Sequence, residues 1–396
     1  MKLMDLAKSK LLDGPNTLGK DRSGSLACLS VRFALEFNMD GTAGDVARTQ
    51  VERHMRLCLA ATAGRDTLVT LAGSEPLLAE AAYELMKGTQ SNPVYHLANH
   101  SDLNCVDRGR RGELVAALLI MRACDAARAV SSGQRWIPVD VFMEELLPPD
   151  AYEIFKRSFP TSYCKNENKE FVATFEDYGI WFNHVIKVEQ HKMFSADHLW
   201  KYITRGAMIL CSSNQEGIDI VIPICHTQRP LSRDSVTAIL VQVKNAEDFQ
   251  LTIKKTLFDK MDPIALGLFP NTEELKVAPK PVIRIVFALA AHKAGVEVRT
   301  EPQRRRHHED PFTAFDIWCA GLGDKAFKHT DADLVWYQQL LERSLRPHDA
   351  FDLPDEGKGH KETRIVRGSL RRRMAPLTAF HDAHHAIHLR KSKSVA

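Results

Sequence analysis

The sequence predicts an α/β protein in which a mixed central sheet is flanked by helices, with a helical region ahead of it. Two apolar runs, residues 217–224 and 236–245, have the β-branched content and the length of short buried strands. Further apolar runs predict strands at 282–289 and 315–319. Apolar positions at helical spacing predict helices at 45–87 and 112–127. Because helices and strands alternate along the chain, we expect one mixed sheet with helices on its faces.

The first two strands are predicted to form an antiparallel hairpin, because turn-forming residues 229–234 lie between them. If Asp219 lies opposite Gln242 or Lys244, the centre of the hairpin falls near residues 230–232, where the turn residues are. Side chains two apart share a face of a strand, and an antiparallel partner brings the start of one strand beside the end of the other. The sequence therefore places Asp219, Gln242 and Lys244 on one face at one end of the hairpin.

A charged side chain in a buried strand is costly unless something pairs with it, so these three residues call for an explanation. A carboxylate and an amide oxygen suit a hard divalent cation such as Mg²⁺ or Mn²⁺, which takes oxygen ligands and keeps several waters. Asp219 and Gln242 are the candidate ligands, and Lys244 could orient a water or stabilise a charged phosphate. Two structural alternatives stay open: an internal Asp219–Lys244 ion pair, and a Gln242 amide that only hydrogen-bonds inside the sheet.

The spacing of Asp219 and the Gln242-Val243-Lys244 segment resembles the PD-(D/E)XK nuclease superfamily, in which a strand aspartate is followed by a second strand with (D/E)-x-K. The Q-x-K form is similar to the Mrr-like restriction branch. The resemblance implies a restriction-endonuclease-like core and a further glutamate from a preceding helix. Glu113 is the best match, although the long segment between Glu113 and Asp219 departs from the family pattern. The alternative is that Glu113 only stabilises the first turn of its helix, by up to about 1 kcal/mol.

This resemblance implies a metal-dependent phosphodiesterase that acts on nucleic acid, most simply DNA. Its catalytic set would be Asp219, Gln242, Lys244 and Glu113, and its Mg²⁺ or Mn²⁺ ligands would be Asp219, Gln242 and Glu113. An alternative from a different class is a non-catalytic effector or interaction protein on a decayed nuclease scaffold. The glutamine at the second ligand position keeps that alternative open.

Residues 45–345 also resemble a family of largely uncharacterised multi-helical proteins of mushroom-forming fungi. The segments that carry this resemblance include the helix at 112–127 and the strand start at 215–219. Some relatives in that family appear alongside Crinkler-type effector and transposon-associated sequences. The resemblance implies that the strand pair belongs to one fold, and it carries little functional content.

Three regions are predicted along the chain: a helical region at 1–108, an α/β core at 109–345, and a flexible basic tail at 346–396. Residues 1–40 are rich in Gly, Ser and Asp, which predicts a loosely ordered start. Helices are predicted at 51–61 and at 75–86, where Pro76 occupies a permitted first-turn position.

The core contains a long insertion between residues 128 and 206, with structured segments of its own. The sequence predicts strands at 136–141 and 179–188, helices at 150–158 and 195–202, then a strand at 207–212 and a helix at 247–260. His184 shares a strand face with Phe182 and Ile186, which favours a hydrogen-bonded, half-buried histidine.

The composition of the 396 residues is typical of an intracellular globular protein, with a formal net charge of only +3. The eight cysteines form no C-x-x-C pair, which favours reduced core thiols over a disulfide framework or a zinc site. The chain shows no signal-peptide pattern and no membrane-spanning apolar run, so we expect a cytoplasmic or nuclear location and no membrane partner. The sequence has no P-loop, dinucleotide-binding or nucleophile-elbow motif, which disfavours a nucleotide triphosphatase or a serine hydrolase.

Nucleic-acid contacts would have to come from local positive segments. Residues 304–308, Arg-Arg-Arg-His-His, form a dense positive loop that could contact phosphates or simply be exposed. From Lys361 onward nine basic residues stand against two acidic ones, a net charge of +7 suited to salt-sensitive contacts. The same segment has four histidines at helical spacing: His381, His384, His385 and His388. Because no Cys or H-E-x-x-H motif supports a zinc site, a solvated helix is favoured.

Overall fold

The computed structural model describes residues 2–18, 22–35, 42–61, 68–87, 93–99, 108–132, 134–164, 167–188, 190, 193–212, 215–269, 280–299, 311–328 and 330–342. The chain divides into two units, Met1–Pro347 and His348–Ala396, and every described element belongs to the first. The predicted positive loop at 304–308, the basic tail and its four histidines lie outside the described residues.

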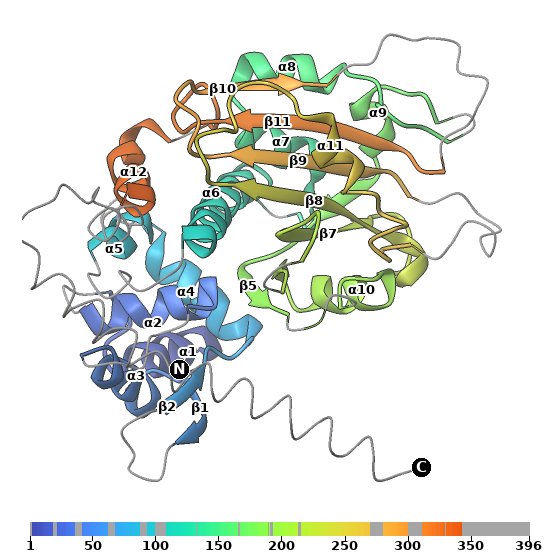
Figure 1. Ribbon diagram of the computed structural model, residues 1–396. Helices are drawn as coiled ribbons and strands as arrows, with labels where there is room; N and C mark the ends of the chain where they lie inside the picture. Colours follow the sequence, from blue (N-terminus) through green and yellow to red (C-terminus); the bar gives the residue numbers. More distant parts are fainter. Residues whose placement is uncertain are drawn as a thin grey trace, which may run out of the picture. The chain divides into compact units, whose positions relative to one another are not determined.

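A mixed sheet of nine strands forms the centre of the described structure (Figure 1). In chain order the strands are β3 (Ile137–Pro138), β4 (Tyr178–Ile180), β5 (His184–Lys187), β6 (Ala207–Leu210), β7 (Ile220–His226), β8 (Val236–Lys244), β9 (Val282–Ala288), β10 (Gly295–Val298) and β11 (Ala314–Ala320). The main path across the sheet is β10–β11–β9–β8–β7–β4–β3, while β6 pairs with both β7 and β5. The predicted fold class, an α/β protein with a mixed central sheet flanked by helices, is confirmed.

Parallel and antiparallel pairs meet at the middle of the sheet. β7 and β8 are antiparallel, whereas β8, β9 and β11 run parallel to one another. The first seven residues of β8 are all buried. A strand covered by helices on both faces has no solvent side, which is why β8 has a nearly continuous apolar run in the sequence.

Two hydrophobic cores lie on the two faces of the sheet. The first contains Ile239 and Val241 and is covered by α6 (Arg108–Val130), α7 (Val139–Leu146), α8 (Pro149–Lys156), α9 (Phe171–Phe175) and α12 (Leu334–Glu342). The second contains Ala238 and Leu240 and is covered by α10 (Ala196–Thr204) and α11 (Lys255–Asp259). Two short 3-10 helices complete the described core: η2 (Arg233–Ser235) and η4 (Asp331–Asp333).

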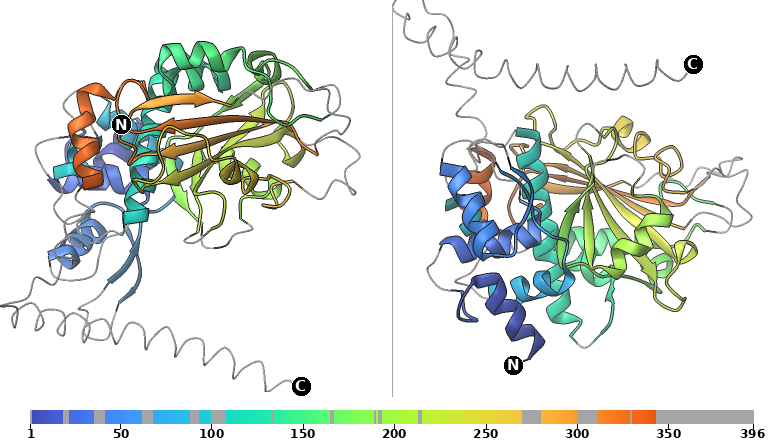
Figure 2. Two further views of the ribbon diagram at one scale, coloured as in Figure 1. Left: turned by 45° about the horizontal axis from the view of Figure 1, so that its top comes forward. Right: turned by 90° about the horizontal axis from the view of Figure 1, so that it is seen from below.

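The N-terminal region is largely helical, and Figure 2 shows it gathered beside α6. Its elements are α1 (Leu3–Leu12), α2 (Arg22–Phe33), α3 (Thr42–Arg53), the strands β1 (Leu57–Ala61) and β2 (Leu68–Leu71), α4 (Pro76–Met86) and α5 (Pro93–Asn99). The prediction of a loosely ordered start is wrong for α1 and α2. Small residues such as Ser25, Ala27 and Cys28 are almost completely buried in α2, so their size serves close helix packing.

The predicted helix at 51–61 is also corrected, because residues 57–61 form β1, which pairs with β2. Helix α3 ends at Arg53, and Met55 then adopts a left-handed conformation with φ of 60°. The Arg56 guanidinium donates hydrogen bonds to the Thr70 and Ser30 hydroxyls, at 2.7 and 2.5 Å. These non-local contacts fix the chain as a strand where the local pattern alone predicts a helix.

The predicted insertion at 128–206 is part of the main sheet, since it supplies β3, β4 and β5. Its helices form as predicted, as α8 and α10, but the strand predicted at 179–188 is split into β4 and β5. The strand predicted at 136–141 is only two residues long before α7 begins. The helix predicted at 247–260 is limited to α11.

Six of the seven cysteines in the described residues are buried, and all seven are free, as the sequence predicts. Cys58 on β1 is the exposed one. Among the described residues, no helix has the length and apolar character needed to cross a membrane.

Buried and half-buried polar side chains join the N-terminal helices to the core. Arg32 on α2 makes two hydrogen bonds to the Asp125 carboxylate on α6, at 3.0 and 2.8 Å. Glu80 on α4 pairs with Arg128 on α6 and accepts a hydrogen bond from the Asn183 amide at 3.1 Å. Arg32 is almost completely buried, so removing Asp125 would leave its charge without a partner. These contacts connect the N-terminal helices to α6.

We expect His184 to make the stability of the protein depend on pH. It is completely buried and hydrogen-bonded, more buried than the sequence predicts, and burial with the nearby Arg205 and Arg32 lowers its pKa to about 4. Because the ordinary histidine pKa is about 6.5, the unfolded chain takes up this proton first as the pH falls. Keeping His184 neutral therefore contributes about 3 kcal/mol to the free energy of unfolding above pH 6.5, and this contribution is lost as the pH falls from 6.5 to 4.

Urea unfolding of the wild type and of His184→Gln at several pH values measures this contribution. The difference between the two free energies of unfolding should shrink as the pH falls from 6.5 to 4, because glutamine does not titrate. A difference that stays constant across that range would show that His184 is not held neutral in the folded protein.

Candidate functional site

The hairpin of β7 and β8 forms with the predicted turn. Its register pairs Ile220 with Val241 and Cys225 with Val236, so its centre falls at residues 230 and 231. Continued by one residue, this register places Asp219 opposite Gln242. The hairpin prediction, including the position of the turn, is confirmed.

A glycine sets the backbone path that leads into Asp219. Gly217 has a φ of +88°, a left-handed conformation that side chains other than hydrogen disfavour. A Cβ atom at this position would overlap the carbonyl oxygen of Lys260, just beyond α11. The adjacent Glu216 carboxylate binds the Lys260 ammonium at 2.8 Å. The start of the hairpin is therefore tied to the end of α11.

Asp219 is a half-buried carboxylate bound to the backbone of the neighbouring strand. Its Oδ2 accepts a hydrogen bond from the Val243 amide N–H at 2.6 Å. Burial raises the pKa of Asp219, while that hydrogen bond and the Lys244 ammonium act in the opposite direction. A carboxylate whose pKa is raised by burial is one that a positive charge would stabilise.

Gln242 presents an unsatisfied oxygen beside this carboxylate. The residue is 5% exposed, and within the described structure its Oε1 has no hydrogen-bond partner. Ala238 and Leu240 lie in the second core, so strand alternation puts Gln242 and Lys244 on that same face. Leaving a buried oxygen without a partner costs about 1–3 kcal/mol, so this position calls for a ligand.

The Lys244 ammonium lies near both Asp219 and an aromatic ring. It lowers the pKa of Asp219, and it is 5.9 Å from the centre of the Phe249 ring. The Lys254 ammonium lies 4.0 Å from the same ring. Two cations therefore lie near the Phe249 ring at the end of β8.

Glu113 lies at the same end of the sheet but on a helix that covers the opposite face. A Cβ atom at its neighbour Gly112 would be 3.0 Å from the Asn245 Cβ, just after β8. After burial, the carboxylates of Asp219 and Glu113 are the causes that raise the pKa of the Cys211 thiol. The structure thus groups Asp219, Gln242 and Lys244 on one face and places Glu113 beyond the edge of that group.

The structure also bears on the alternatives for Asp219 and for a metal. The Asp219 carboxylate accepts its hydrogen bond from the β8 backbone and not from Lys244, so a direct ion pair is not what holds it. Among the described residues no three His, Cys, Asp or Glu side chains gather closely enough to hold a metal. Any metal here would be bound by two carboxylates at most, an amide oxygen and water.

Two residues near the site were not singled out by sequence reasoning. Cys211 follows β6, and its backbone N–H donates to the Asp219 carbonyl oxygen at 2.8 Å. Its place after the apolar run 207–210 was a usable signal, because alternation puts it on the face of Ile209. Phe249 lies in a polar segment that gives no periodic signal.

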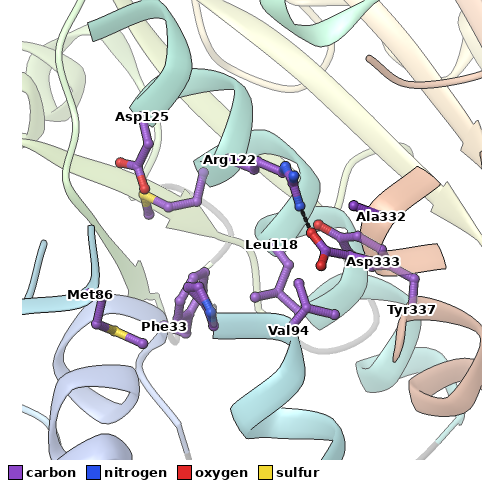
Figure 3. A pocket seen from close by; sticks show the side chains of 11 residues that line it. Phe33, Met86, Val94, Leu118, Arg122, Asp125, Ala332, Asp333 and Tyr337 are labelled. Carbon is purple, nitrogen blue, oxygen red and sulfur yellow. Dashed lines mark hydrogen bonds and ion pairs between the residues drawn. The ribbon is translucent and has the colours of Figure 1, made fainter. Parts of the chain in front are cut away.

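A separate cavity of about 500 Å³ lies away from this hairpin, between α6, α12 and the N-terminal helices. Figure 3 shows its charged side, where Arg122 on α6 binds Asp333, and its apolar side, with Phe33 and Met86. None of the four predicted site residues lines it.

The comparisons with known proteins place the chain in a family without assigning it an activity. No curated protein and no solved structure matches the chain. Residues 18–334 match a family described as a domain of unknown function, DUF8736. Since this match covers most of the chain, including helices α2 to α5 and the whole described sheet, the protein belongs to the DUF8736 family.

Proposed function

We propose that the protein is a metal-dependent phosphodiesterase acting on nucleic acid, most simply DNA, through Asp219, Gln242, Lys244 and Glu113. The observation that carries the proposal is the buried Gln242 Oε1, which has no partner within the described structure and lies across the hairpin from Asp219. A divalent cation held between this oxygen and the carboxylate would satisfy both groups. Mg²⁺ or Mn²⁺ fits, because both take oxygen ligands and keep several waters.

The order of elements supports the same reading. A helix with an acid, α6, is followed, after the segment that supplies β3 to β6, by the antiparallel pair β7 and β8, then by α11 and by β9 parallel to β8. This is the core order of the PD-(D/E)XK superfamily that the sequence resembles. Fold order alone does not determine chemistry, so the weight rests on the side chains at the end of the hairpin.

Each residue has a role that follows from its position. Asp219 and the Gln242 amide would hold the cation, and Glu113 would bind through water from the neighbouring helix. When bound, Mg²⁺ supplies a Lewis acid that polarises a phosphate and lowers the pKa of a water. The Lys244 ammonium, on the same face, would position the nucleophile and offset the charge that develops on the phosphate.

Calorimetric titration of the chelator-treated full chain with MnCl₂ and MgCl₂, beside nicking of supercoiled plasmid, tests this function. We expect one binding site and metal-dependent nicking in the wild type. Asp219→Asn should weaken binding at least about tenfold and abolish nicking, because the charged ligand is lost. Asp234→Asn is the matched control, since Asp234 lies exposed near the turn at the other end of the hairpin.

Two results would contradict the proposal. Metal-dependent nicking that is unchanged in Asp219→Asn would place the activity elsewhere. A wild type that binds no metal and nicks no DNA would favour the non-catalytic effector on a decayed scaffold, which the glutamine ligand keeps open.

A further inference from the structure

Three side chains outside the hairpin of β7 and β8 form a chain of hydrogen bonds that ends in a serine. The Ser74 Oγ lies 2.8 Å from the His184 Nε2, and the His184 Nδ1 lies 2.8 Å from the Asn183 Oδ1. Ser74 precedes α4, whereas Asn183 and His184 lie at the start of β5, so the set unites segments more than a hundred residues apart.

The surroundings fix which nitrogen of His184 carries the proton. The Asn183 Nδ2 donates hydrogen bonds to the Glu80 carboxylate at 3.1 Å and to the Pro76 carbonyl at 3.4 Å. The Asn183 Oδ1 must therefore face His184 and accept from Nδ1–H. The Nε2 atom is left as an acceptor aimed at the Ser74 hydroxyl, which is the tautomer a general base requires.

A cation lies on the solvent side of the serine. The Arg205 Nε is 3.4 Å from the Ser74 Oγ, and a terminal nitrogen of the same guanidinium donates to the Ser74 carbonyl oxygen. Arg205 is exposed and Ser74 is partly exposed, while His184 is completely buried. A reagent can thus reach the hydroxyl beside a guanidinium, with the imidazole shielded behind it.

We propose that Ser74 is an activated nucleophile for acyl esters that carry an anionic group, with His184 as its general base and Arg205 as the group that binds the anion. Asn183 is a positioning residue that fixes the His184 tautomer. The arrangement meets the nucleophile, base and orienting-group criteria of covalent catalysis. It is a second site, independent of the Asp219 hairpin.

The chemical step balances with water as the only co-reactant. The Ser74 Oγ forms a bond to the ester carbonyl carbon as its proton passes to the His184 Nε2. The bond from that carbon to the leaving alkoxide then breaks, and the alkoxide takes the proton from Nε2. Water hydrolyses the acyl-serine by the same transfers in the reverse sense.

The surroundings of His184 limit the rate of the proposed ester hydrolysis. Burial, together with Arg205 and Arg32, lowers the pKa of His184 to about 4, so the base is neutral at pH 7 but forms its imidazolium reluctantly. An anionic substrate beside Arg205 would offset part of that penalty, which is why the proposal specifies an anionic ester.

Labelling of the full chain with a fluorophosphonate probe, read by peptide mass spectrometry, tests the nucleophile. In this reaction the Oγ–P bond forms, the P–F bond breaks, and the serine proton passes through His184 to solvent. We expect labelling of Ser74 that is absent in Ser74→Ala and at least about tenfold slower in His184→Gln. Asn183→Leu should also slow the labelling. Asn183→Asp keeps an oxygen for Nδ1–H but turns its second oxygen toward the Glu80 carboxylate, so it should restore the labelling rate only in part.

The chain offers a matched control in a second serine–histidine pair. The Ser195 Oγ lies 2.9 Å from the His198 Nδ1 on α10, without an amide that orients the ring among its described contacts. Ser195 should stay unlabelled, and Ser195→Ala should leave the labelling of Ser74 unchanged.

Ester hydrolysis tests the anionic preference, with 4-nitrophenyl succinate and neutral 4-nitrophenyl butyrate as probes. The succinate ester should react at least about threefold faster, and Arg205→Met should remove that difference. Circular dichroism confirms that each variant is folded, and Ser74→Cys, alkylated with iodoacetamide, reports the nucleophile if His184→Gln unfolds.

Three outcomes would overturn the proposal. The first is a folded wild type with no label on Ser74, and the second is a labelling rate that His184→Gln leaves unchanged. The third is a thiol introduced by Ser74→Cys that reacts with iodoacetamide no faster than the exposed thiol of Cys58.

Discussion

Lys244→Met should lower the turnover number for metal-dependent nicking by about 10²–10³-fold and leave the affinity for Mn²⁺ within about a factor of two. The reason is that, in the proposed mechanism, the Lys244 ammonium would act on the reacting phosphate and would bind no cation itself. Methionine keeps most of the length and the apolar stem of lysine, so packing against Phe249 should survive. Loss of the charge also raises the pKa of Asp219, because the Lys244 ammonium lowers it in the wild type.

Lys254→Met is the matched control for this experiment, because both ammonium groups contact the same Phe249 ring. It removes an equal charge from the same surface, and Lys254 is not on the strand that carries Gln242. We expect its effect to be less than about tenfold and to fade with added salt. Equal losses in the two variants would mean that Lys244 contributes only to general attraction of the nucleic acid.

The central hairpin could be predicted from sequence because its signals are local. Two apolar strands, a polar turn and period-two alternation determine the register of β7 and β8 and hence the partner of Asp219. Glu113 shows where this reasoning stops. Its position relative to Asp219 depends on which face of the sheet α6 covers, and no local pattern encodes that choice.

The errors in the N-terminal region have the same origin. Strand β1 follows a helical segment with no break in the apolar spacing of the sequence. Hydrogen bonds from Arg56 to Thr70 and Ser30 favour the strand conformation over the helix. The Ser74, Asn183 and His184 chain likewise joins residues that no sequence motif connects. Local patterns identify elements, and long-range polar contacts decide how ambiguous segments fold.

Polar and charged residues in the apolar strands of this chain have two different environments. Arg284 on β9 and Asp316 on β11 interrupt apolar runs just as Asp219 does, and the structure pairs them with each other at 2.7 Å. Both of their groups are satisfied, so they need no ligand. Asp219 accepts one hydrogen bond from the Val243 N–H, but the Gln242 Oε1 opposite it has no partner within the described structure. That difference distinguishes the end of the hairpin from the Arg284–Asp316 pair.

Asp316→Ala should therefore destabilise the fold by about 3–5 kcal/mol. The Asp316 carboxylate is almost completely buried and accepts hydrogen bonds from Arg284, from Arg299 at 2.8 Å and from the Thr161 hydroxyl at 2.8 Å. Its removal leaves the buried Arg284 guanidinium without its carboxylate, on a sheet face where water cannot replace it. Thr161→Val removes only a neutral partner and should cost about 1 kcal/mol.

Urea unfolding followed by circular dichroism compares these variants with Asp234→Ala, which removes an exposed carboxylate and should change the free energy of unfolding by less than about 0.5 kcal/mol. If Asp316→Ala does not fold at all, Asp316→Asn, which keeps an acceptor oxygen, provides a measurable intermediate loss. A loss below about 1 kcal/mol in Asp316→Ala would mean that the two arginines find water or other acceptors. A buried charge would then be tolerated equally well with or without a partner. The unpartnered oxygen of Gln242 would no longer indicate a ligand site.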